Sequence, residues 1–192
     1  MTMDVPPAAA RERRFYLGSA TLLVAITIAG FARTYYFRSY FHSPQLRPFL
    51  HFHGAIMTAW IALFMIQVVL IVLRNLRLHR LLGYFGAILA AAVVCMGCAA
   101  TTLAAIREVR AHSSYVPMQL NILGLELTQM MLFGVFVGVA VWYRRNRPLH
   151  KRFMLLGTLC MLPNPEIRMM PFFHSNLPYL IIWTVEVSCC CD

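Results

Sequence analysis

Ionisable and amide side chains that interrupt long apolar runs are the places where this chain could perform chemistry. A polar group inside such a run is costly against lipid and by default indicates a ligand site, a pathway or a partner. At 1.5 Å per helical residue, most of these groups fall at comparable depth in the outer half of a membrane. We therefore predict one polar pocket in the outer leaflet that binds a small ligand or a metal. Its candidate ligand-binding residues are His53, Gln67, Glu126, Glu166 and Arg168.

Two pairs of residues have spacings that suggest a metal or haem site. His51-x-His53 offers two imidazoles, but they lie about 200° apart on a helix and would not both face one centre. Cys95-x-x-Cys98 suits a redox or metal pair, although Cys95 also extends a stripe of small residues, and packing is the simpler interpretation. If copper or haem binds, the candidate metal ligands are His53 and Cys98.

Each charged candidate also has a plainer interpretation. Glu126 would lie at the interface if its helix began later, and Glu166 with Arg168 would form a salt bridge at the outer edge. His79 and His150 occupy matching positions in two basic hinges, as either a paired inner site or ordinary hinge residues at the headgroup boundary. No Walker-type loop, Ser-x-x-Lys pair or His-Glu-x-x-His motif occurs, so no catalytic residue is assigned and enzyme activity is left open.

The elements that position these residues are apolar helices. The 192 residues are 60% hydrophobic and only 12% charged, whereas a soluble domain carries about 25% charged residues. Apolar runs separated by short basic loops are typical of a polytopic membrane protein. We predict an all-α transmembrane bundle with five full spans and an incomplete sixth. The full spans are predicted over 15–31, 49–73, 81–106, 119–143 and from 153 onward, and the sixth over 177–191.

Polar and proline-containing stretches predict how the chain is divided. We expect a disordered cytoplasmic tail over 1–14 and a single transmembrane domain over 15–192. Pro163 and Pro165 break the fifth span, and exposed backbone at that depth is tolerated only beside protein or water. The hinges RNLRLHR and RNRPLHK lie 71 residues apart (145 − 74) and suggest that spans two–three and four–five form a parallel repeat.

Small residues predict which helix faces pack closely. The third span carries a stripe at four-residue spacing, and the fourth span carries a Gly-x-x-x-Gly pair. We expect both to lie inside the bundle. The stripe consists of Gly83, Ala87, Ala91, Cys95 and Ala99.

The net charge of +10 is explained by where the cations lie. Of the 17 Lys and Arg residues, 11 fall on the side of the N-terminus, so the positive-inside rule predicts a cytoplasmic N-terminus in a bacterial inner membrane. The cations do not form a stripe interleaved with exposed aromatics, which argues against nucleic-acid binding. The predicted partners are the lipid bilayer and, as open alternatives, a second copy or a larger membrane complex.

Four motifs together resemble a known group of proteins. They are Gly30-Phe31-Ala32-x-Thr34-Tyr35-Tyr36, His51-x-His53-Gly54…Trp60…Gln67, Leu78-His79-Arg80-x-x-Gly83, and His150-Lys151-Arg152-x-Met154-Leu155-Leu156. The pattern covers about residues 12 to 170 and resembles an uncharacterised family of bacterial multipass inner-membrane proteins with no established activity. Such proteins usually continue with further spans, so the resemblance implies a truncated or altered C-terminus here.

Three functions fit these patterns. The first is an integral inner-membrane protein of unknown activity whose outer-leaflet pocket binds a small ligand or a metal. The second is a haem- or copper-binding redox or oxidase-assembly protein that uses His53. The third is a small proton-coupled transporter in which Glu126 titrates. The sequence alone does not choose between them.

Overall fold

The described part of the chain is helical. A computed structural model describes residues 7–42, 45–112 and 114–173, and all the regular structure in these ranges consists of helices, which confirms the all-α prediction for them. In chain order the elements are α1 (Pro7–Phe31), the π-helix η1 (Ala32–Tyr36), α2 (Pro48–Val72), α3 (Leu76–Arg110), α4 (Val116–Trp142), α5 (Arg147–Leu159) and α6 (Pro163–Phe173).

Four of the described helices are long and apolar enough to cross a membrane. They are the continuous α1–η1 helix from Ala10 to Tyr36 with 27 residues, α2 with 25, α3 with 35 and α4 with 27. Each exceeds the ~20 residues that a hydrocarbon core requires. Length and composition therefore support residence in a membrane.

The predicted fifth span consists of two short helices. α5 has 13 residues and α6 has 11, so neither is long enough to cross a bilayer alone. The interruption falls directly before Pro163, where the sequence places its break. Five uninterrupted spans are thus not present in the ranges described above, and the predicted sixth run over 177–191 lies outside them.

The first helix starts earlier than we predicted. α1 begins at Pro7, whereas a disordered tail was expected through residue 14. Alanine, arginine and glutamate dominate this stretch, and all three are strong helix formers. Glu12 also forms an ion pair with Lys151 of α5, which attaches the first turns of α1 to the bundle.

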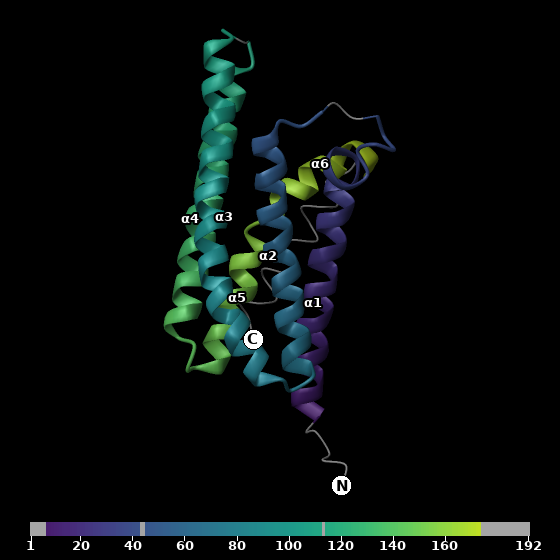
Figure 1. Ribbon diagram of the computed structural model, residues 1–192, viewed down its shortest axis with the longest axis vertical. Coiled ribbons are helices and arrows are strands. Elements are labelled where there is room, and N and C mark those ends of the chain that lie inside the picture. The colour runs from purple at the N-terminus through teal and green to yellow at the C-terminus, as the bar shows by residue number, and fades with distance from the viewer. Residues whose placement is uncertain (1–6, 43–44, 113, 174–192) are drawn as a thin grey trace.

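The long helices lie alongside one another and alternate in direction (Figure 1). Each helix from α1 to α4 packs against the next one in the chain, and α6 packs against α1. The start of α1, the α2–α3 turn and the α4–α5 turn lie at one end of the molecule (Figure 1). All three cationic stretches of the sequence are therefore at the same end.

Two apolar clusters hold the bundle together. The first joins α1, α2 and α5 through Ala20, Leu23, Phe64, Leu155, Leu159 and Leu162. The second joins α2, α3 and α4 through Trp60, Ile61, Ala90, Val93, Met130, Phe133 and Val137. In the second cluster the rings of Trp60 and Phe133 meet edge to face, with centroids 5.0 Å apart.

The face of α3 that packs inside the bundle is not the predicted one. Four members of the predicted stripe are exposed, namely Gly83, Ala87, Ala91 and Cys95. The buried residues of α3 are instead Ala90, Val93, Gly97, Thr101 and Ala105. Ala90 and Ala91 are about 100° apart on the helix, and both faces carry small residues. Spacing alone could not show which face meets α4, where the absent side chain of Gly97 makes room for Met130.

A backbone contact at Gly30 holds α6 against α1. A Cβ atom at Gly30 would overlap the backbone of Pro165, which is fully buried. The start of α6 therefore reaches α1 only because position 30 carries no side chain.

Gly30→Ala is expected to lower the thermal unfolding midpoint of the protein in detergent. The Pro165 backbone cannot move aside as a flexible side chain can, and overpacking of this kind costs about 1–3 kcal/mol. Gly18→Ala is the matched control in the same helix, because no atom lies within 4 Å of its new Cβ. Gly18→Ala should keep or raise the midpoint, since alanine is the better helix former. Equal midpoints for the two variants would contradict the contact.

Candidate functional site

His53 lies in the second turn of α2 and is half-buried. Its ring hydrogen-bonds the backbone of Met96 in α3, whereas Nδ1 is buried without a partner. A buried polar atom without a hydrogen bond is costly, so it is an unusual feature of a packed helix. The second nitrogen of His53 is thus available to a ligand or to a proton.

A carboxylate and a guanidinium from two other helices lie within electrostatic range of His53. Glu126 of α4 and Arg168 of α6 both interact electrostatically with His53, and they interact with each other. The Arg168 guanidinium also lies over the ring of Phe31, 5.0 Å from its centroid, which is a cation–π geometry. We call His53, Glu126 and Arg168 the acid–base cluster. These are three of the five predicted ligand-binding residues; His53 and Glu126 are half-buried and Arg168 is exposed.

Glu166 lies in the first turn of α6 and is only 2% exposed. A carboxylate at a helix N-terminus is stabilised by the helix dipole, which lowers the cost of its burial. The offset of two residues directs Glu166 and Arg168 to different faces of α6. Glu166 therefore lies buried next to Pro165, where α6 contacts α1.

The π-helix η1 positions the first turns of α2. The Tyr35 hydroxyl donates to the His51 carbonyl at 3.1 Å, and the Tyr36 hydroxyl pairs with Thr58 Oγ1 at 2.9 Å. The ring of Tyr35 lies against Gly54, where a Cβ atom would overlap it. Single π-helical turns occur frequently at functional sites because they re-aim the side chains around them.

These contacts were not predicted, although their signal was present. Gly30-Phe31-Ala32-x-Thr34-Tyr35-Tyr36 and His51-x-His53-Gly54 lie at facing ends of two spans that follow each other in the chain. Tyr35, Tyr36 and Thr58 belong to the residues that set the position of His53. Reading the two motifs as one contact would have found them.

Gln67 lies at the other end of α2, away from the acid–base cluster. It is 14 residues from His53, which is about 21 Å along a helix. Its Nε2 donates to the backbone carbonyl of His79 at 3.2 Å. His53 and Gln67 lie on the same face of α2, but they lie at different depths along it.

The two cysteines of the Cys95-x-x-Cys98 pair face different surroundings. Cys98 is half-buried and packs against the second apolar cluster, whereas Cys95 is exposed. Across 7–42, 45–112 and 114–173, no group of three or more His, Cys, Asp or Glu residues is arranged to hold a metal ion. Metal binding through His53 and Cys98, and with it haem or copper, stays a prediction.

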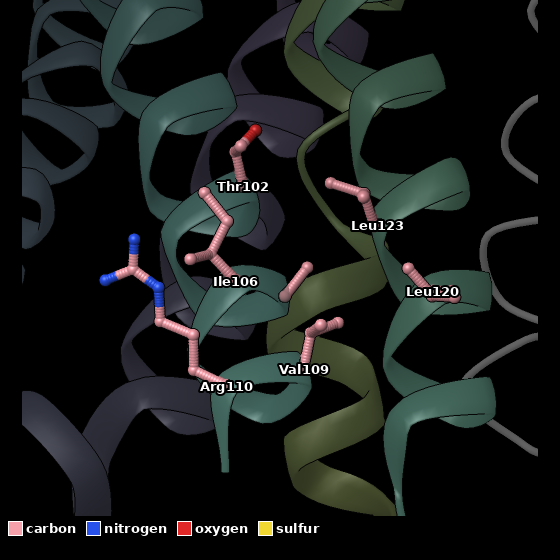
Figure 2. Close-up of a pocket in the computed structure, with 7 residues that line it drawn as sticks. Thr102, Ile106, Val109, Arg110, Leu120 and Leu123 are labelled. Atoms are coloured by element: carbon pink, nitrogen blue, oxygen red, sulfur yellow. The ribbon is translucent and has the colours of Figure 1, made fainter. Parts of the chain in front are cut away.

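A cavity of roughly 300 Å³ lies elsewhere, between the ends of α3 and α4 that are remote from the basic hinges (Figure 2). Its walls are almost entirely apolar, and Arg110 stands at its α3 side. The lining residues are Thr102, Ala105, Ile106, Val109, Arg110, Leu120 and Leu123. None of the predicted ligand-binding residues lines it, so this cavity is not the predicted polar pocket.

Comparison with known proteins gave no match. No protein-family model, no curated protein and no solved structure matches it. The interpretation of the site therefore rests on the geometry of the acid–base cluster alone.

A double-mutant cycle tests the acid–base cluster. We expect Glu126→Gln and Arg168→Gln each to lower the unfolding free energy in mixed micelles, because each leaves its partner's charge uncompensated. The double variant should lose less than the sum, with a coupling of about 0.5–3 kcal/mol.

Glu12→Gln combined with Arg168→Gln is the control for that cycle. Glu12 pairs with Lys151 at the opposite end of the bundle, so these two changes should add to within about 0.5 kcal/mol. An additive result for Glu126 and Arg168 as well would show that they do not interact.

Proposed function

We propose that this chain is a multipass protein of the bacterial inner membrane that binds a small charged ligand at the acid–base cluster. The observation that carries the proposal is the electrostatic interaction among His53, Glu126 and Arg168, which come from three different helices. Ionisable groups inside a membrane bundle are expensive and are typically retained for a ligand or an ion pathway. Membership of the uncharacterised family that the motifs resemble is part of the same proposal.

The distribution of cations supports a cytoplasmic N-terminus. The basic stretch of α1 and the two basic hinges lie at one end of the molecule (Figure 1). Positive side chains are retained on the cytoplasmic face of inner-membrane proteins. This orientation assigns the acid–base cluster to the outer leaflet, as the depth of His53 in α2 also suggests.

The chemistry of the cluster favours a ligand that carries charge. The guanidinium offers a fork of donors for a carboxylate or phosphate, and Glu126 offers an acceptor for an amine. The unpartnered Nδ1 of His53 adds a donor or an acceptor, according to its protonation. Helix α6, which carries Arg168, follows the interruption of the fifth span, and interrupted helices are a recognised feature of substrate sites in membrane proteins.

Thermal shift in detergent tests the ligand site. We expect at least one class in a panel of small zwitterions, carboxylates and amines to raise the unfolding midpoint of the wild-type protein. A ligand present at about 100 times its Kd adds roughly 2.7 kcal/mol, which is a shift of several degrees. Glu126→Gln and Arg168→Gln should each remove the shift, and Glu12→Gln should keep it. A panel without effect, or a shift that survives in both site variants, would contradict the proposal.

Proton-coupled transport is a second candidate, which the electrostatic interaction between Glu126 and His53 favours. Carboxylates and histidines inside a membrane bundle are the groups from which proton relays are built. Proteoliposomes that contain a pH-sensitive dye should acidify when the stabilising ligand is added outside. Glu126→Gln should abolish the acidification, whereas Glu108→Gln should not. Equal rates for wild type and Glu126→Gln would leave binding without proton coupling.

A further inference from the structure

The two basic hinges have the same local structure at their ends. Asn75 caps α3 by accepting from the N–H of Leu78 at 3.2 Å, and Asn146 caps α5 by accepting from the N–H of Leu149 at 3.4 Å. In both helices a histidine follows four residues after the cap. The two turns thus share an asparagine cap and a following histidine at matching positions.

The bundle brings the two matching histidines together. The ring centroids of His79 and His150 lie 6.4 Å apart, with the ring planes at 84°. His150 Nδ1 bonds the carbonyl of Ala140 at 2.8 Å, which leaves its Nε2 to face other partners. His79 Nδ1 and Gln67 Oε1 are buried without a hydrogen bond. We call His79, His150 and Gln67 the inner seam.

The inner seam is surrounded by positive charge. The hinges 74–80 and 144–152 contain eight Lys and Arg residues and no acidic residue. They are Arg74, Arg77, Arg80, Arg144, Arg145, Arg147, Lys151 and Arg152. Glu12 of α1 pairs with Lys151.

An anion suits this region better than a metal ion. The excess of cations over anions repels a divalent ion, and the two hinge segments contain no carboxylate to offset that repulsion. The hinges end apolar helices at the membrane surface, where the fixed anions are lipid phosphates. The asparagine caps already accept from backbone N–H groups at the starts of α3 and α5. The Lys and Arg side chains therefore provide the attraction for an anion.

We propose that the paired hinges bind a phospholipid with two phosphates, one phosphate at each hinge and the inner seam between them. Two equivalent cationic elements side by side match a headgroup with two equivalent anions. Diphosphatidylglycerol (cardiolipin) has this chemistry, whereas phosphatidylglycerol has one phosphate and phosphatidylethanolamine is zwitterionic. The proposal rests on the multipass arrangement above, but it is independent of the ligand at the acid–base cluster.

Native mass spectrometry of the full chain in detergent tests the site. After delipidation, wild type should bind one cardiolipin at least tenfold more tightly than one phosphatidylglycerol. Arg74→Gln with Arg145→Gln removes one matched cation from each hinge and should weaken cardiolipin binding about thirtyfold. His79→Ala should weaken it about tenfold, because a hydrogen bond to a charged group is lost.

Two controls separate the site from general charge and from misfolding. Arg47→Gln with Arg110→Gln makes the same charge change at the other end of the bundle and should retain cardiolipin binding. Arg74→Lys with Arg145→Lys keeps the charge and should bind within about threefold of wild type. Inorganic pyrophosphate at the same concentration should not displace the lipid.

Three results would overturn the proposal. They are equal affinity for cardiolipin and phosphatidylglycerol, unchanged binding in the Arg74→Gln, Arg145→Gln variant, and displacement of the lipid by pyrophosphate. A protein that does not fractionate with membranes at all would instead contradict the multipass arrangement. Failure of the lipid-binding proposal and failure of the multipass arrangement are therefore distinguishable.

Discussion

A backbone polar group at membrane depth must find its partner within the protein, and this constraint is strongest at the break between α5 and α6. The prolines supply no N–H at two positions, which reduces the number of donors to be satisfied. Short turns pair donors on both sides of the prolines: Leu162 N–H bonds the Leu159 carbonyl, and Glu166 N–H bonds the Leu162 carbonyl. Leu162 and Pro165 are also buried. The break is thus a satisfied, packed turn rather than a frayed helix end.

The acid–base cluster depends on this turn. A continuous fifth helix would carry the chain past the bundle along one line, but the turn lets α6 cross to α1 at Gly30. Arg168 is thereby placed over Phe31 and within electrostatic reach of Glu126. An arginine in a membrane bundle is stabilised by a counter-charge and an aromatic face. The turn brings Arg168 to the Phe31 ring and within range of the Glu126 carboxylate.

Hydropathy located the helices because the cost of exposing polar groups to lipid acts on every residue of a span. It also placed the break correctly, since the effect of Pro163 and Pro165 on the backbone is local. The predicted packing face of α3 was wrong because Ala90 and Ala91 are equally small, and only the position of α4 distinguishes them. Gln67 was grouped with His53, although it lies at the other end of α2, because a shared helix face carries no information about depth. The split of the fifth span into α5 and α6, with α6 packed on α1, depends on tertiary contacts that no local pattern encodes.

The middle of α2 separates the two polar regions of the bundle. Trp60 lies seven residues from both His53 and Gln67 on the same face, which is about 10 Å in each direction. It is 2% exposed and meets the fully buried ring of Phe133 edge to face. A solute at the acid–base cluster therefore cannot continue along this face without displacing two packed aromatic rings. Such a barrier suits a binding site open to one side, and it requires any transport cycle to include a rearrangement of α2 against α4.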